Sequence, residues 1–129
     1  MRIALTAQGA ALDDLLDPRF GRARMLLIVD EETGDVAAHD RSTNLDVAQG
    51  AGIRAAQEVA QLGAGALITG NVGPGAFRAL KAAGISVFLA EDCTAAEALE
   101  RFRRHEQTEQ KDASGSGRPG AGRRPPTGG

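Results

Sequence analysis

Short, mostly apolar runs along the chain predict five β-strands. They cover residues 3–7, 25–29, 35–39, 66–69 and 85–89. Runs of this length and composition are typical of strands that pack between two layers. The turn sequence 32–34 separates the second run from the third, so we expect these two strands to form a hairpin.

Helical periodicity fills the gaps between the later strands. Residues 47–62 place apolar side chains on one stripe, and Gly63 follows where a left-handed cap would end a helix. A second helix starts at Pro74, because the first helical turn tolerates a residue without an N–H group. A third starts at Thr94, which has the spacing of a capping box with Glu97. The predicted order is βββαβαβα, an α/β fold with helices on the faces of a mixed sheet.

Length and composition fit one folded domain. The chain has 129 residues, of which 42% are apolar but only 3% aromatic, so we expect one core built from Ala, Val, Ile and Leu. The apolar periodicity ends near Glu106, and the last residues are mainly Gly, Pro, Ser, Arg and Thr. The sequence therefore predicts a domain over residues 1–105 and a disordered tail over residues 106–129.

Charge and cysteine content exclude several classes of function. A net charge of −2, without a dense stripe of Lys and Arg, argues against a nucleic-acid partner. The first apolar run is too short for a signal peptide or a membrane span, so we expect a cytoplasmic protein without a membrane partner. Cys93 is the only cysteine, which rules out an intrachain disulfide and a zinc site made of thiolates alone.

Two motifs carry a likeness to a known family. The first is Asp17-Pro-Arg-Phe-Gly-Arg-Ala23, and the second extends from Gly50-Ala-Gly-Ile through Gly70-Asn-Val-Gly-Pro-Gly-Ala76 to Ala83-Gly-Ile85. In this order they resemble the dinitrogenase iron-molybdenum cofactor biosynthesis family, over roughly residues 1–104. The resemblance implies a three-layer fold with the ribonuclease H-like motif. Its mixed five-stranded sheet has the order 3-2-1-4-5 with strand 2 antiparallel, in agreement with the strands predicted above.

That strand order predicts where a ligand would bind. The carboxyl ends of strands 1, 3, 4 and 5 and the start of strand 2 would lie at one edge, and the connections after strands 1 and 4 would leave toward opposite faces. A crevice should therefore form between two loops. The residues expected to bind a cofactor there are Arg19, Phe20, Gly21, Arg22, Gly70, Asn71, Gly73 and Gly75.

Both loops have residues suited to an anion. The glycines permit close backbone approach, and a helix that starts at Pro74 would direct N–H groups into the crevice. Arg19 and Arg22 could add guanidinium donors to sulfide, oxo or carboxylate groups. Two structural alternatives stay open: the glycines could simply form a tight turn, and Arg19 could pair with Asp17.

His39 and Cys93 are the two side chains that we predict as direct metal ligands at near-neutral pH. Each also has an ordinary structural interpretation, because a lone histidine at a strand end is usually solvated and a lone buried cysteine usually acts as a small apolar residue. A nuclease with paired metal ions is disfavoured, since the strand cores lack the acidic side chains that such a site needs.

The resemblance and the motifs lead to one functional expectation. We expect a small binding protein, not an enzyme, that carries an iron-sulfur or iron-molybdenum type cluster, or its precursor, during metallocofactor assembly such as that for nitrogen fixation. Its partners would be the metal cluster and the proteins that donate or accept it. The alternative is a regulatory protein-interaction module of the same fold without a bound cluster.

Overall fold

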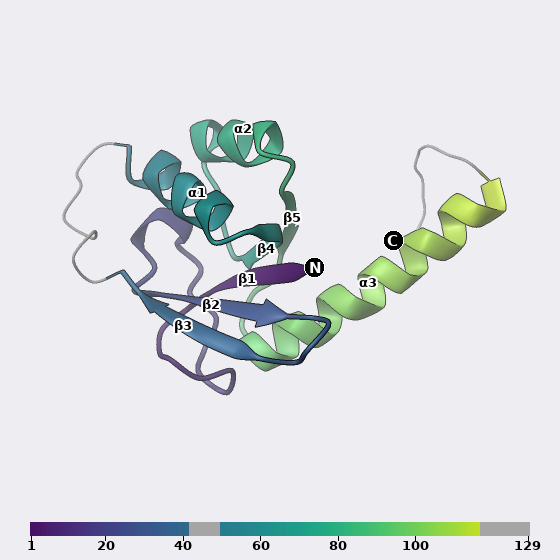
Figure 1. Cartoon of the computed structure of the whole chain (residues 1–129), viewed down its shortest axis with the longest axis horizontal. Helices are drawn as coiled ribbons and strands as arrows, with labels where there is room; N and C mark the ends of the chain where they lie inside the picture. Colours follow the sequence, from purple (N-terminus) through teal and green to yellow (C-terminus); the bar gives the residue numbers. More distant parts are fainter. Residues whose placement is uncertain (42–49, 117–129) are drawn as a thin grey trace. The chain divides into compact units, whose positions relative to one another are not determined.

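A computed structural model describes residues 1–41 and 50–116 of the chain (Figure 1). A compact unit over Met1–Leu99 holds the whole sheet, and a second unit starts at Glu100. The strands are β1 (Arg2–Ala7), β2 (Met25–Asp30), β3 (Val36–Asp40), β4 (Ala64–Thr69) and β5 (Ser86–Leu89). The helices are α1 (Ala51–Gln61), α2 (Pro74–Ala82) and α3 (Ala95–Ser116), with a short 3-10 turn η1 (Phe20–Arg22).

The five strands form one mixed sheet in the order β3-β2-β1-β4-β5. β2 is antiparallel to both of its neighbours, whereas β1 is parallel to β4 and β4 is parallel to β5. The predicted fold class, strand order and antiparallel second strand are therefore confirmed. Because Ala7 pairs with Met25, the carboxyl end of β1 and the start of β2 lie at the same edge, as expected.

Small aliphatic side chains join α1 and α2 to one face of the sheet. The shared core contains Ala4, Leu26 and Leu67 from the strands, and Ala56 and Leu80 from the helices. Strand side chains alternate between faces, so Ile3 and Leu5 point to the opposite face, and they too are fully buried. Both faces of the central strands are thus covered, which explains why their sequences are almost continuously apolar.

A buried set of hydrogen bonds fixes the loop after β1 to the seam between β1 and β4. The Oγ1 atoms of Thr6 and Thr69 lie 2.7 Å apart, and Thr6 Oγ1 lies 2.7 Å from the carbonyl oxygen of Asp17. The N–H of Asp17 donates in turn to the carbonyl of Thr6 at 2.9 Å. These contacts set the position at which the predicted arginine loop begins.

One predicted boundary differs from the sequence-based expectation, and parts of two predicted segments lie outside the described residues. The first three residues of the predicted first helix, 47–49, lie outside the described residues. α3 continues to Ser116, beyond the boundary at Glu106 where we placed the start of the tail. Residues 106–111 include several Glu, Gln and Lys, which favour a helix without producing an apolar stripe. Residues 117–129 of the predicted tail also lie outside the described part.

Within the described residues, no helix has the length and apolar character needed to cross a membrane.

Replacing Thr6 by valine tests the buried hydrogen bonds. Thr6→Val keeps the side-chain shape but leaves the Asp17 carbonyl and the Thr69 hydroxyl without their shared partner, so we expect a loss of about 1–3 kcal/mol in unfolding free energy. Urea denaturation measures it. Thr33→Val is the matched control: it removes an exposed hydrogen bond from the N–H of Asp35, which water can replace, so the loss should be smaller, below about 1 kcal/mol. Equal losses in the two variants would contradict this role of Thr6.

The turn between β2 and β3 contains an acid-sensitive group. Hydrogen bonds from the N–H groups of Glu32 and Thr33 lower the pKa of Asp30 from its ordinary value of 3.8. A carboxyl whose pKa is lowered on folding adds stability above its unfolded pKa and loses that contribution as the pH falls through the folded pKa. We expect Asp30→Asn to flatten the dependence of stability on pH below about pH 4. Unfolding curves between pH 7 and pH 2 measure this, and parallel profiles for the two proteins would contradict it.

Candidate functional site

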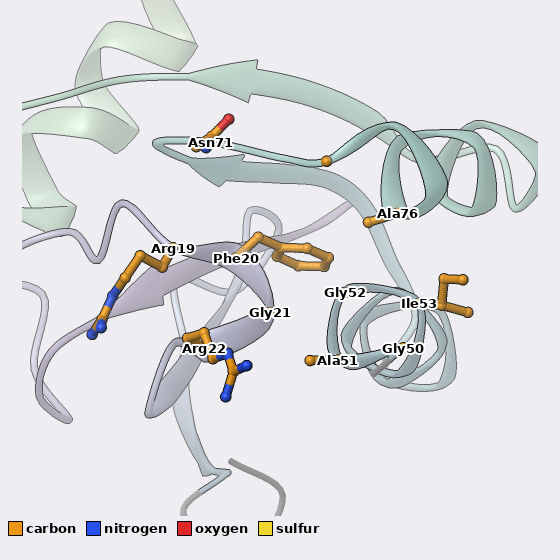
Figure 2. Close-up of a pocket in the computed structure, with 11 residues that line it drawn as sticks. Arg19, Phe20, Gly21, Arg22, Gly50, Ala51, Gly52, Ile53, Asn71 and Ala76 are labelled. Atoms are coloured by element: carbon orange, nitrogen blue, oxygen red, sulfur yellow. The ribbon is translucent and has the colours of Figure 1, made fainter. Parts of the chain in front are cut away.

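A hollow of about 370 Å³ opens at the edge of the sheet where the sequence predicted a crevice. Figure 2 shows that it lies between η1, the N-terminal end of α1 and the turn that leads into α2. Most of the residues around it are exposed, so the hollow is open to solvent. The lining residues are Arg19, Phe20, Gly21, Arg22, Gly50, Ala51, Gly52, Ile53, Asn71, Gly73 and Ala76.

Phe20 and Gly21 fix one wall of the hollow. The Phe20 ring is 2% exposed and points between the N-terminal ends of α1 and α2 (Figure 2). Its N–H donates to the carbonyl of Asn71 at 3.4 Å. A side chain at Gly21 would place its Cβ only 2.9 Å from the backbone nitrogen of Gly52, so η1 and α1 approach each other closely because residue 21 is glycine. Phe20 thus acts mainly as a core anchor, with little surface left for a ligand.

The two predicted arginines lie on different sides of this wall. Arg19 donates from its backbone N–H and from Nε to Oδ1 of the buried Asp17, at 2.9 and 3.3 Å. Its side chain is 69% exposed and, in Figure 2, points away from α1 and α2. Arg22 lies on the side of the α1 N-terminus. The structural alternative for Arg19, pairing with Asp17, is therefore present in the structure, and Arg22 has the position better suited to a ligand in the hollow.

Two helix N-termini meet at the hollow without side-chain caps. Gly50 precedes α1 with φ of 73°, Gly73 precedes α2, and neither helix has a side-chain cap or an acidic residue in its first turn. The first N–H groups of a helix have no partner within the helix, and the helix dipole adds partial positive charge there. Together with Arg22, and with no carboxylate among the described residues that line it, these ends make the hollow electropositive.

The three glycines of the predicted turn have different surroundings: Gly73 lies beside open space, whereas Gly70 and Gly75 pack against neighbouring residues. A Cβ at Gly73 would meet nothing within 4 Å, so this glycine leaves room beside the hollow. A Cβ at Gly70 would lie 2.6 Å from Cα of Pro18, so the two loops pack together only because residue 70 is glycine. Gly75 faces Ile53 between the two helices. Neither Gly70 nor Gly75 lines the hollow, and the tight-turn alternative describes Gly70 well.

His39 and Cys93, the two predicted metal ligands, are not brought to the hollow or to each other. His39 is in β3 at one edge of the sheet, where its Nε2 lies 3.7 Å from Oε1 of Glu58. Cys93 follows β5 and is 4% exposed, and its carbonyl accepts a hydrogen bond from the N–H of Leu16, in the loop after β1. Among the described residues, no group of three or more His, Cys, Asp or Glu side chains is placed to hold a metal ion. The two side chains are therefore not joined in one site, and direct ligation by either one stays a prediction.

Residues 50–53 at the start of α1 belong to the hollow but were not among the predicted site residues. The glycines at positions 50 and 52 were the available sequence signal, because they precede a helix in the same way as Gly73. Arg41 was also missed: it is fully buried beside this corner of the fold, although it stands in a polar stretch of sequence.

Comparison with known proteins identifies the family. The sequence profile described as dinitrogenase iron-molybdenum cofactor matches residues 1–105. The chain belongs to this family. An uncharacterised protein of Methanocaldococcus jannaschii is 31% identical over 104 residues, which is 79% of this chain and 85% of that protein. The family predicted from the two motifs is thus confirmed.

Two solved structures of similar proteins have the same fold. The apo form of the orange protein from Desulfovibrio gigas is 48% identical, with a TM-score of 0.78, covering 81% of this chain and 88% of that one. A putative NifB protein from Thermotoga is 35% identical, with a TM-score of 0.70, covering 80% and 87%. A family named for a metallocofactor, and a relative solved in an apo form, suggest a small cluster-binding or carrier protein in cofactor biosynthesis.

The groups that line the hollow are better suited to donate hydrogen bonds to the outer atoms of an anion than to coordinate a bare metal ion. Among the described residues, the lining of the hollow has no histidine, cysteine or carboxylate side chain that could bond to a metal. It does contain guanidinium groups and backbone N–H groups, which donate hydrogen bonds to sulfide or oxo atoms. A cluster that arrives with its metals already coordinated by such atoms matches this set of donors.

A pair of glycine substitutions tests the construction of the walls. Gly21→Ala forces η1 away from Gly52 and should lower the unfolding free energy by about 1–3 kcal/mol. Gly73→Ala adds a methyl group in open space at a φ of −70°, so its effect should stay below about 1 kcal/mol. Thermal and urea denaturation measure both. Equal stability of the two variants would contradict the close approach at Gly21.

Proposed function

We propose that this protein is a non-enzymatic, cytoplasmic carrier that binds an anionic iron-sulfur or molybdenum-containing cluster, or its precursor, in the hollow. The cluster is cargo, received from one protein and passed to another during metallocofactor assembly. Membership of the iron-molybdenum cofactor family supports the class of cargo. That the cargo is anionic, and that the protein binds its outer atoms rather than its metals, is inferred from the geometry of this chain.

The single observation that carries the proposal is the meeting of two uncapped helix N-termini with Arg22 around an open hollow. Helix N-termini bind phosphate and other anions because several N–H donors and the helix dipole point at the same place. Two helix N-termini that face the same space raise the positive electrostatic potential there, and a guanidinium group adds charge-assisted hydrogen bonds. Sulfide and oxo atoms on a cluster are acceptors for these groups.

The size and openness of the hollow suit a transient cargo. A volume of about 370 Å³ is within the range of small-molecule sites, roughly 300–1,000 Å³. Exposed residues form much of its rim, including Ile53, which is 46% exposed. A cluster in this place would stay accessible to a donor or acceptor protein, which a carrier requires.

Anaerobic reconstitution tests the function. The whole protein is incubated with ferrous iron and sulfide, with and without molybdate, then desalted and examined by elemental analysis and visible absorption. We expect a defined ratio of metal to protein and charge-transfer bands. Retention of the cluster should weaken as salt rises, because salt screens exposed charges.

Arginine variants test whether the cluster binds in the hollow. Loss of one charge-assisted hydrogen bond of about 1.5 kcal/mol corresponds to roughly tenfold weaker binding, so Arg22→Gln should retain roughly tenfold less cluster at low salt. Arg19→Gln should have a smaller effect, because Arg19 pairs with Asp17 and points away from the helices. Arg78→Gln on α2, outside the hollow, is the control. Absence of any bound cluster, or equal behaviour of the Arg22 and Arg78 variants, would disprove the proposal.

A further inference from the structure

Arg41 is the largest fully buried side chain in the described part of the protein, and it connects two segments that are distant in sequence. It follows β3 directly. Its Nε lies 2.8 Å from Oε1 of Glu58 on α1, and its Nη2 lies 3.4 Å from Oε2 of the same carboxylate. Its Nη1 donates to the carbonyl of Ala23 at 2.7 Å, and its backbone N–H donates to the carbonyl of Arg24 at 2.8 Å.

A buried guanidinium is a costly way to fill space. Removing a charge from water is unfavourable unless hydrogen bonds and an opposite charge compensate it, and apolar residues of similar volume often stabilise such a place as well or better. Arginine offers something that an apolar side chain lacks. Its planar, rigid set of donors can bind a carboxylate on one side and a carbonyl on another at the same time. Here the two acceptors belong to Glu58 and Ala23.

These two acceptors belong to the two segments that form the walls of the hollow. Ala23 comes directly after Arg22 and ends the 3-10 turn that forms one wall, while Glu58 is on the helix whose first residues form the other. The close approach of Gly21 to Gly52 fixes these walls at one point. Arg41 links them at a second place, which restricts the rotation that a contact at one point would leave.

We propose that Arg41 is a positioning residue of the hollow: with Glu58 and Ala23 it sets the distance and angle between Arg22 and the N-terminal end of α1. It does not line the hollow and would not touch the cargo. The proposal rests on the carrier function above, since it assigns Arg41 a role in that site. His39, 3.7 Å from Oε1 of Glu58 and 42% exposed, is an outer partner of the carboxylate and is not needed for the link.

The test compares anion affinity among variants with matched stability. Arg41→Lys keeps the charge but cannot reach both acceptors, and Glu58→Gln keeps the side-chain shape but removes the opposite charge. Val29→Ala, in the core toward the other end of the strands, is a destabilised control that leaves the walls intact. The probe is tetrathiomolybdate, a tetrahedral anion of molybdenum and sulfide, titrated into whole protein well below the unfolding temperature.

We expect Arg41→Lys to weaken the binding of the probe by roughly tenfold or more, as loss of an outer-shell partner does in metal sites. Glu58→Gln should weaken it in the same direction, and Val29→Ala should bind like the wild type. Wild-type affinity in the Arg41 variant would overturn the proposal. So would an equal loss in the Val29 variant, because affinity would then simply follow stability.

A second measurement on the free protein separates this proposal from the proposed function. Amide NMR shifts of Arg22, Ala51 and Gly52 should move in Arg41→Lys and stay in place in Val29→Ala, whether or not the wild type binds the probe. Unchanged shifts in the Arg41 variant would overturn the positioning role. A wild type that binds no probe while these shifts do move would count against the carrier function and leave the positioning of the walls supported.

Discussion

The buried hydrogen bonds among Thr6, Thr69 and Asp17 are the constraint on which the rest of the candidate site depends. They join the carboxyl ends of two parallel strands to the loop that follows the first of them. Strand pairing alone would leave that loop free to lie in many places. Held at the seam, it brings Phe20 into the core and places Arg22 beside a helix that begins far along the chain.

Backbone N–H groups, more than side chains, supply the polar groups of the site. Glycine before α1 and before α2 leaves these two N-termini without a side-chain cap, and glycine at position 21 lets the walls meet. Small residues thus expose N–H groups that larger ones would cover or cap. Charge enters from the arginines, and the only buried guanidinium described here is used to align the walls.

Much of the fold was predictable because it follows from local patterns. Apolar runs, turn residues and helical stripes gave the element order, and the family likeness gave the strand order that places residues 19–22 opposite Asn71 and Gly73. The same patterns did not predict that Phe20 is also buried in the core, because an aromatic residue in a polar loop gives no sign that it reaches the core. Arg41 was missed for a similar reason, since its burial depends on a carboxylate on another element. Side chains that act through distant partners leave no periodic signal.

The described residues that line the hollow include no histidine, cysteine or carboxylate, which bears on how the proposed cargo would leave it. A cluster bonded to the protein through its metals departs only by ligand exchange, a chemical reaction with its own barrier. A cluster held only by N–H donors would leave without breaking a metal–protein bond, as water replaces those hydrogen bonds, and an acceptor with metal-binding side chains would hold it more strongly. The direction of cluster transfer would then depend on how strongly the receiving protein binds the cluster.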